Sequence, residues 1–297
     1  MISLLVATVN RVDELDRLLS SLEEQRYRDF EVIVVDQNSD DRVVRALDRH
    51  PNLVLRHLRS ERGLSRARNS GLLVARGDIV GIPDDDCWYP RELLASVGEW
   101  FDAHAEFGLL STALRTLDGQ SSGPNLPATS RRCTKANVWR CAISTTLFWR
   151  RSVTEAIGGF NENMGVGAPS RYQSGEETDY VLRAFERGFE MWHESSLTVH
   201  HPALNSLERL RKNTYPFALG AGCILRLHRY RLDQVGGHVL RSMGGAAVSL
   251  CQGDWARAEI YVLRGAGQLV GYVLGPRDLR RCTTASSSFY ILPNRST

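Results

Sequence analysis

The stretch Gly77-Asp-Ile-Val-Gly-Ile-Pro-Asp-Asp-Asp86 indicates the fold class of this 297-residue chain. Ile79–Ile82 is a short apolar run of the kind that forms a buried strand, and Pro83 ends it. Three aspartates follow directly. Because adjacent carboxylates repel one another, the end of this strand needs compensating positive charge.

Strand and helix signals alternate on both sides of this stretch. The alternation is typical of right-handed crossovers in an α/β fold, with a mostly parallel, Rossmann-like sheet flanked by helices. Ligands bind beyond the carboxyl ends of such strands, so the polar residues there are candidates for function. The expected strands are Ile2–Ala7, Phe30–Val35, Leu53–His57 and Ile79–Ile82, and the expected helices are a leucine-rich segment over 15–22, Leu64–Arg76, and Arg91–His104, which Pro90 starts.

The alternation stops after about residue 205, and helices with interspersed glycines are expected from there. Three domains or segments follow from this: an α/β domain over 1–205, a helical extension over 206–285, and a tail over 286–297. Within the first, we expect a loop over Leu117–Asn137, strands over Ile143–Trp149, Phe189–Trp192 and Leu197–Val199, and a helix over Glu176–Arg187.

The composition is that of an ordinary globular protein and excludes several classes of function. Apolar residues make up 42% and charged ones 24%, and the net charge of +3 is too small to indicate a nucleic-acid partner. The six cysteines form no CxxC pair, which argues against zinc modules and disulfides and fits a reducing, cytoplasmic compartment. The N-terminus lacks the basic region of a signal peptide, and the longest uncharged stretches hold 13 residues, short of the ~20 that a membrane span needs.

Two interpretations fit the aspartates Asp84, Asp85 and Asp86. A divalent cation such as Mg²⁺ or Mn²⁺ prefers oxygen ligands and would offset their charge. Alternatively, they form a solvated turn that caps the following helix. Asp36, at the end of an earlier strand, suits a ribose hydroxyl or a simple polar turn, and Thr8-Val-Asn-Arg11 lacks the glycines of a dinucleotide-binding loop.

Three further groups could carry chemistry. The arginines Arg62, Arg66 and Arg68 suit a diphosphate clamp or a solvated helix face. The acids Glu176, Glu177 and Asp179 suit a general base or the first turn of a helix, where the dipole stabilises anions. The strand-end pair His200 and His201 could supply an imidazole ligand to the ion or lie at the surface.

The ordered set of these motifs resembles the bacterial family 2 inverting glycosyltransferases. The resemblance covers about residues 1–202, the catalytic domain, and implies the glycosyltransferase-A fold, a nucleotide-diphosphate-sugar donor and a divalent metal. The motifs are Thr8-Val-Asn-Arg11, Val35-Asp-Gln-Asn-Ser-Asp-Asp41, Gly63-Leu-Ser-Arg-Ala-Arg-Asn-Ser-Gly71, Gly77–Asp86, Ile157-Gly-Gly-Phe-Asn-Glu162, Gly175-Glu-Glu-Thr-Asp179 and Val199-His-His201.

The resemblance also implies roles for individual residues. Asp84 and Asp86 would bind Mn²⁺ or Mg²⁺, with Asp86 as the direct ligand, and His200 or His201 would meet the metal or the diphosphate. The late acid pair is normally Glu-Asp with the aspartate as base, whereas here it is Glu176-Glu177, and we expect Glu177 to be the base, with Glu176 as the alternative. Ile143-Ser-Thr-Thr146 would form part of the acceptor wall. The donor would be bound by Thr8, Asn10, Arg11, Asp36, Arg66, Arg68, Asp84 and Asp85.

We therefore expect a metal-dependent inverting glycosyltransferase of the hexosyltransferase type, acting in bacterial polysaccharide or glycolipid assembly. The expected donor is a UDP-sugar, and the expected acceptor is a saccharide or a lipid-linked saccharide. A non-catalytic sugar-nucleotide-binding or scaffolding protein and a nucleotidyltransferase are the alternatives. Residues 207–241 hold seven basic and two acidic side chains, a net of +5, among apolar ones. That pattern suits peripheral contact with an anionic inner membrane surface, and the alternative is a packing or homodimer layer.

Overall fold

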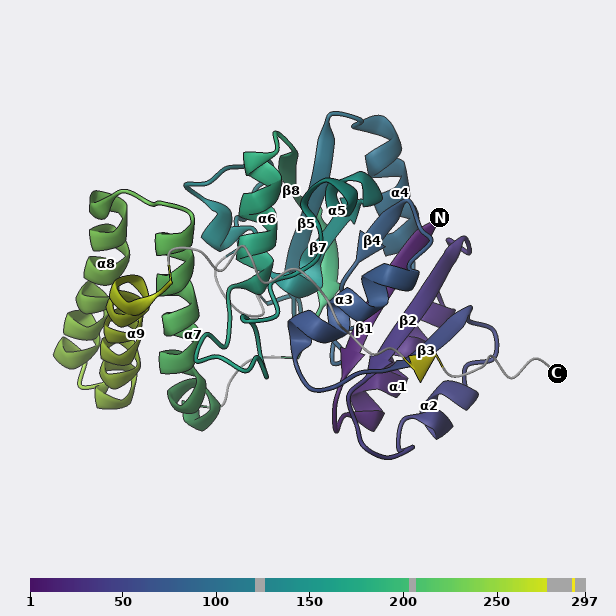
Figure 1. The fold of residues 1–297 in the computed structure, drawn as a ribbon, viewed down its shortest axis with the longest axis horizontal. Coiled ribbons are helices and arrows are strands. Elements are labelled where there is room, and N and C mark those ends of the chain that lie inside the picture. The colour runs from purple at the N-terminus through teal and green to yellow at the C-terminus, as the bar shows by residue number, and fades with distance from the viewer. Residues whose placement is uncertain (121–125, 203–206, 277–289, 292–297) are drawn as a thin grey trace.

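The computed structural model describes residues 1–120, 126–202, 207–276 and 290–291, which form an α/β fold (Figure 1). The strands are β1 (Ile2–Thr8), β2 (Phe30–Asp36), β3 (Leu55–Arg59), β4 (Ile79–Gly81), β5 (Phe107–Arg115), β6 (Arg131–Cys133), β7 (Leu147–Arg150), β8 (Glu190–His200) and β9 (Tyr290–Ile291). The α-helices are α1 (Val12–Glu23), α2 (Val44–Asp48), α3 (Leu64–Val74), α4 (Leu93–Ala103), α5 (Arg151–Ile157), α6 (Glu176–Glu186), α7 (Leu207–Leu227), α8 (Leu232–Cys251) and α9 (Trp255–Leu274).

The described strands form one sheet, in the order β6-β8-β5-β7-β4-β1-β2-β3-β9. β3, β2, β1 and β4 are parallel neighbours, and β5 is parallel to β8. Because β7 lies antiparallel between β4 and β5, the pair β5 and β8 runs in the same direction as β1. Six of the nine described strands therefore share one direction, which confirms the predicted mostly parallel sheet.

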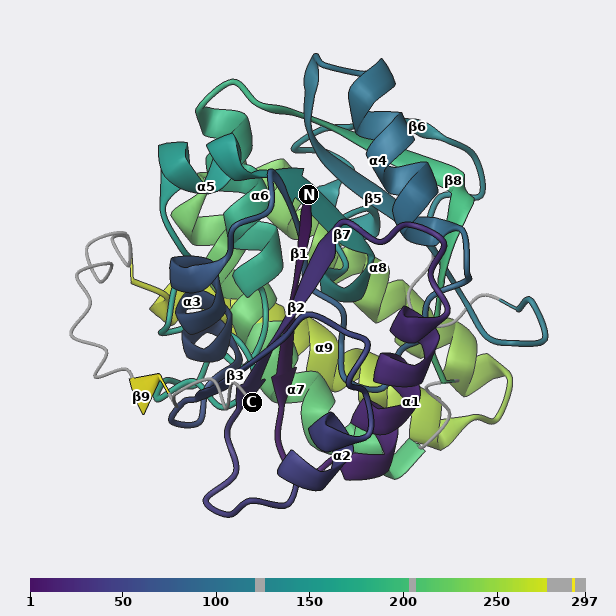
Figure 2. The same ribbon diagram turned by 90° about the vertical axis from the view of Figure 1, so that its right-hand side faces the viewer.

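Helices cover both faces of this sheet. Side chains alternate between the faces along each strand, so Leu4 of β1 packs with the leucines of α1 and α4, while Leu5 packs in a second core with α3, α5 and α6. Figure 2 shows α1, α2 and α4 on one side of the strands and α3, α5 and α6 on the other. The carboxyl ends of the parallel neighbours β1, β2 and β4 lie at one edge of the sheet.

The helices α7, α8 and α9 form a further layer beside α6, away from β1–β3 (Figure 1). His228, just after α7, ties this layer to α6: its Nε2 lies 2.9 Å from Asp179 Oδ1 and its Nδ1 3.0 Å from Glu186 Oε1. Among the described residues, no helix combines the length and hydropathy that crossing a membrane requires. The last part of the predicted extension, residues 277–285, and all of the predicted tail except 290–291 lie outside the described residues.

Several predicted boundaries are wrong. The helix predicted from Pro90 begins at Leu93, because the Leu93 N–H bonds to the Pro90 carbonyl in a preceding turn. The strands predicted over Phe189–Trp192 and Leu197–Val199 are one strand, β8. It pairs with β5 on both sides of an irregular polar middle, and its first part also pairs with β6. The segment predicted as a loop over Leu117–Asn137 contains the short edge strand β6.

Three smaller differences concern strands. The strand predicted over Leu53–His57 lies two residues later, as β3. The strand predicted over Ile143–Trp149 begins only at Leu147, because Ser144–Thr146 form a 3₁₀ turn before it. The central strand β5 was not predicted at all, although Phe107–Arg115 is buried almost throughout.

Candidate active site

Polar side chains from separate motifs meet at the carboxyl edge of the sheet. Thr8, the last residue of β1, lies opposite Asp36 of β2, and its Oγ1 donates to Asp85 Oδ2 at 2.8 Å. Arg11 Nη1 donates to Asp85 Oδ1 and to Asp86 Oδ2, both at 2.7 Å. The turn after β1 therefore supplies part of the positive charge that the three aspartates need.

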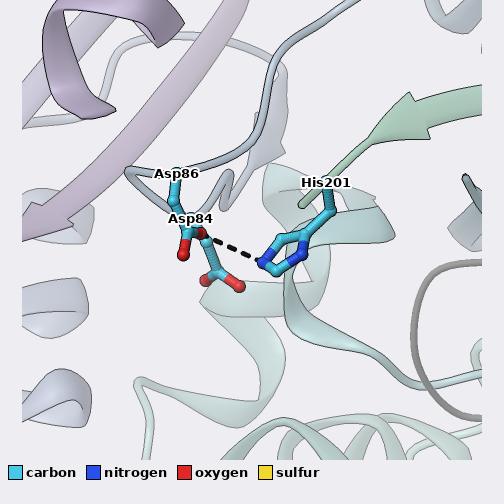
Figure 3. A group of neighbouring side chains, drawn as sticks. All are labelled: Asp84, Asp86 and His201. Carbon is cyan, nitrogen blue, oxygen red and sulfur yellow. Dashed lines mark ion pairs between the residues drawn. The ribbon is translucent and has the colours of Figure 1, made fainter. Parts of the chain in front are cut away.

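The side chains of Asp84, Asp86 and His201 form a group that fits a divalent cation (Figure 3). One ligand atom from each lies within 4.8 Å of the others, and His201 Nε2 is 3.1 Å from Asp86 Oδ1. That carboxylate oxygen is buried, and apart from this ion pair it has no partner in hydrogen-bond geometry, so it has a lone pair for a ligand. Two carboxylates and an imidazole, without thiolates, suit Mn²⁺ or Mg²⁺ better than a thiophilic ion.

The three aspartates differ in pKa because their partners differ. Desolvation raises the pKa of Asp84 and brings that of Asp85 to about 6, against the opposing charges of Arg68 and Arg11. Burial acts in the same way on Asp86, but His201 and Arg11 outweigh it, and the pKa of Asp86 lies below its ordinary value. A divalent cation would stabilise the ionised form of Asp84 as well.

We call Asp84, Asp86 and His201 the acid group, and Arg68 connects this group to Glu176 at the start of α6. It is almost fully buried in α3, and its Nη1 donates to Glu176 Oε1 at 3.0 Å while Nη2 lies 3.6 Å from Asp84 Oδ1. Arg66, one of the other predicted donor-binding residues, instead pairs with Glu61 and lies 3.5 Å from Glu162 Oε2. Of the two, the structure brings Arg68 to the aspartates.

A cavity of about 570 Å³ begins at the acid group and extends to the C-terminal helices. Asp86, His201 and Glu177 line its inner side, whereas Glu176 is buried in its pair with Arg68. Desolvation, and then the neighbouring Glu176, raise the pKa of Glu177 well above its ordinary value. A carboxyl group with a raised pKa that faces a cavity is suited to accept a proton from a bound hydroxyl.

Asp36 is fully buried at the end of β2, and its carboxylate already has several donors. It accepts hydrogen bonds from the backbone and side chain of Asn38 at 2.8 and 2.7 Å, and His57 Nε2 and Arg59 Nη1 lie within 3.2 Å. Burial opposes ionisation, but His57 and Asn38 outweigh it and lower the pKa of Asp36. The predicted role of Asp36 at a ribose stays a prediction. His57 and Arg59 were missed, although their two-residue spacing places both on one face of β3.

Two other predicted residues take places outside the acid group. His200 stacks on Trp88, with ring centroids 5.9 Å apart, and its Nδ1 lies 3.3 Å from the Thr116 carbonyl. Of the histidine pair, it is therefore His201 that reaches the aspartates. Asn10 lies in the left-handed region, at φ 59°, and its backbone N–H donates to Asn38 Oδ1 at 2.8 Å, which shapes the turn after β1.

Residues of α7 and α9 form the outer side of the cavity, and the sequence analysis did not predict them. Ile143, which was predicted in an acceptor wall, lines the cavity beside them. The glycines of these helices signal close packing, although they do not show in the sequence which faces line a cavity. A Cβ on Gly222 of α7 would lie 2.1 Å from the Gln268 carbonyl oxygen, and one on Gly271 of α9 would lie 2.2 Å from that of Leu219. Glycines at both positions let the two backbones touch, which fixes the faces that line the cavity.

The mostly parallel sheet flanked by helices matches solved structures of the glycosyltransferase-A fold. A mannosyltransferase from Pyrobaculum calidifontis, solved with GDP-Man and Mn²⁺, has a TM-score of 0.63 at 20% identity, over 90% of this chain and 86% of its own. TarS 1-349 from S. aureus, solved with UDP-GlcNAc, has a TM-score of 0.56 at 17% identity, over 92% of each chain. At these identities the likeness is one of fold.

The model of Glycosyl transferase family 2 matches residues 3–157, more than half of the sequence, and the chain belongs to this family. Glycosyltransferase AglE from Haloferax volcanii is 25% identical over 288 residues, 91% of this chain and 87% of that protein. An uncharacterized glycosyltransferase from Haemophilus influenzae is 37% identical over 95 residues, and the match spans 31% of this chain and only 32% of that relative. Membership in glycosyltransferase family 2 is thereby confirmed, while Glu177 and His201 lie beyond the segment that the family model matches.

Proposed function

We propose that this chain is a metal-assisted inverting hexosyltransferase, which moves a sugar from a nucleotide-diphosphate-sugar to an acceptor hydroxyl. The observation that carries the proposal is that Glu177 faces the same cavity as Asp86 and His201. Solved neighbours that hold UDP-GlcNAc or GDP-Man support a nucleotide-sugar donor. We expect a UDP-sugar.

The donor would lie along the carboxyl edge of the sheet. Asp84, Asp86 and His201 would hold Mn²⁺ or Mg²⁺, and the bound ion would supply positive charge for the diphosphate. Thr8 and Asp36 would contact the base and the ribose, with Asn10, Arg11 and Asp85 shaping the same edge.

The reaction is a single displacement. The Glu177 carboxylate accepts the proton of the acceptor hydroxyl, and the hydroxyl oxygen forms a bond to the anomeric carbon of the sugar. The bond from that carbon to the diphosphate oxygen breaks, and the electron pair leaves with the nucleoside diphosphate. Arg68 stabilises the charge that develops on this leaving group. Attack from the face opposite the leaving group inverts the anomeric configuration.

The reaction products separate this proposal from its alternatives. With Mn²⁺ and a panel of nucleotide sugars, the transferase releases a nucleoside diphosphate, whereas a nucleotidyltransferase releases pyrophosphate. A sugar-nucleotide-binding or scaffolding protein binds a donor and turns over none. An anomeric configuration retained in the product would contradict the single displacement.

Metal dependence is tested at Asp86. Asp86→Ala removes a candidate ligand and should abolish both turnover and the Mn²⁺-dependent part of UDP affinity, measured by calorimetry with and without the ion. Asp102→Asn, an exposed aspartate on α4, is the matched control and should change neither quantity. Full activity of the unaltered protein in excess chelator would contradict the proposal.

We further propose that the protein acts in bacterial polysaccharide or glycolipid assembly, on a saccharide or lipid-linked acceptor, in the cytoplasm and at the inner face of the membrane. The basic and apolar side chains of residues 207–241 support the membrane contact. A homodimer through the same helices is the alternative.

A further inference from the structure

The cavity that begins at the acid group has two chemically different sides. Its only described lining carboxylates, Asp86 and Glu177, lie on the inner side, where the proposed reaction takes place. Its outer side is formed by α7 and α9 and carries two arginines, Arg209 and Arg264, with no acid among the described lining residues. The cavity is therefore negative at the reaction end and positive at the helical end.

The wall between these ends is largely apolar. Phe217 and Leu210 of α7 face the cavity, and both remain more than a third exposed, at 39% and 38%. Large apolar side chains that stay exposed in a concave site mark a place where an apolar ligand can be buried. Trp139, Ile143 and Ala221 continue the same wall.

Polar donors accompany the arginines at the helical end. Asn213 and Gln268 both line the cavity, and Gln268 is nearly buried. Ser242 Oγ donates to Gln268 Oε1 at 3.3 Å, which leaves the amide N–H groups of Gln268 as donors. Glu259, which also belongs to α9, forms an ion pair with Arg211. The Arg264 guanidinium and the Gln268 amide are donors of the kind that bind phosphate or carboxylate oxygens.

From these observations we infer that the acceptor is amphiphilic: an apolar body along Phe217 and Trp139 joins the reacting hydroxyl to an anionic group at Arg264. The inference rests on the proposed function and names the substrate class of the same site. A plain sugar would leave the apolar wall in water and the arginines without a partner from the substrate. A small free anion would use only the helical end.

The test is calorimetry on the full chain with three probes: octyl phosphate, octyl glucoside and inorganic phosphate. Octyl phosphate should bind at least about tenfold more tightly than either other probe, because it alone fills both parts of the site. Arg264→Gln should weaken octyl phosphate about tenfold and leave octyl glucoside unchanged. Arg257→Gln, an equal change of charge on the same helix outside the cavity, should alter neither.

A second variant tests the apolar wall. Ala221→Phe should fill part of the cavity and weaken both octyl probes, with folding checked by circular dichroism. Equal affinity for inorganic phosphate and octyl phosphate would overturn the inference, and so would octyl phosphate binding that neither variant changes. UDP binding with Mn²⁺ should survive in both variants, and its loss would place this wall in the donor site and overturn the inference as well. If the unaltered protein binds no UDP while the probe pattern holds, the proposed function fails and the inference about the cavity stands.

Discussion

Glu176 and Glu177 are neighbours of the same type with opposite surroundings. Successive residues of a helix are rotated by about 100°, so the first turn of α6 directs them to different places. Glu176 turns inward to Arg68, 3.0 Å from its guanidinium, and Glu177 turns to the cavity. The sequence predicts Glu177 as the base with Glu176 as the alternative, and this difference in surroundings also favours Glu177.

The raised pKa of Glu177 predicts a pH dependence. Only the deprotonated carboxylate accepts a proton, so kcat should rise as the pH increases through this raised pKa and level off above it. Glu177→Gln keeps the shape but cannot accept a proton, and kcat should fall on the order of 10²–10⁴-fold while donor affinity stays. Initial rates from pH 5 to pH 9 measure both effects. This pH range lies above the ordinary glutamate pKa of about 4.3, because the pKa of Glu177 is raised.

The controls for this prediction are two other glutamates. Glu155→Gln, on an exposed face of α5, should keep both the rate and the pH profile. Glu176→Gln breaks the pair with Arg68 and should lower the rate without removing the rise with pH. If instead Glu176→Gln removes that rise and Glu177→Gln does not, the base is Glu176.

At the scale of elements, the contact between α7 and α9 decides the shape of the cavity. Three glycines of this contact, Gly222, Gly267 and Gly271, lie where a Cβ would meet backbone or side-chain atoms of the other helix at less than about 3 Å. On α8, by contrast, Gly236, Gly237 and Gly244 face open space. Glycine is therefore required for packing between α7 and α9, whereas at these positions of α8 it only adds to the conformational entropy that folding loses.

This contrast predicts stability changes of opposite sign. Gly271→Ala would place a methyl group 2.2 Å from the Leu219 carbonyl oxygen, and we expect it to lower the free energy of unfolding by about 1–3 kcal/mol. Gly244→Ala, with nothing within 4 Å, should raise it by about 0.5–1 kcal/mol, because alanine loses less conformational entropy in a helix. Urea unfolding measures both, and equal effects of the two substitutions would contradict the packing argument.

At the scale of the whole molecule, the outer surface of the C-terminal helices predicts membrane attachment. Leu232, Leu240 and Trp255 are 70–75% exposed there, close in sequence to the basic residues of 207–241. Co-sedimentation with anionic liposomes should weaken as salt rises, since each basic side chain contributes about 1 kcal/mol within a Debye length. Trp255→Ala should reduce the binding that survives high salt. Equal, negligible binding to anionic and neutral liposomes would instead favour a packing or dimer layer.

The strands β1, β2 and β4 could be predicted from the sequence because each is a short apolar run that polar residues follow within a few positions. β3, Leu55–Arg59, mixes leucines with basic residues, and its predicted position was two residues too early. β5 was missed because Phe107–Arg115 mixes glycine, serine and threonine with its apolar residues and follows a helix without a turn signal. β8 was divided in two because Glu194-Ser-Ser196 is polar, yet backbone hydrogen bonds to β5 on one side and β6 on the other hold its ends in one strand. Backbone pairing of this kind leaves no trace in side-chain polarity.

The candidate site likewise contains residues that could be predicted from the sequence and residues that could not. Asp84, Asp86, His201 and Glu177 could be selected from the sequence because each lies at the end of a strand or the start of a helix, where an α/β fold collects its ligands. Arg264 and Gln268 could not, because a helix rich in glycine does not reveal which of its faces a partner will cover. Their place depends on the crossing of α7 and α9, which is a tertiary property.

The position of α9 has a consequence for the order in which the protein becomes competent during synthesis. The residues proposed for the donor, the ion and the base are all complete by His201, whereas Gln268 and Arg264, which close the cavity, belong to the last described helix. During synthesis, the residues proposed to bind the donor are therefore complete well before those proposed to bind the acceptor. On the proposed function, a chain cut short ahead of α9 would present the activated sugar to water, and it would waste the donor by hydrolysis instead of building a glycoside.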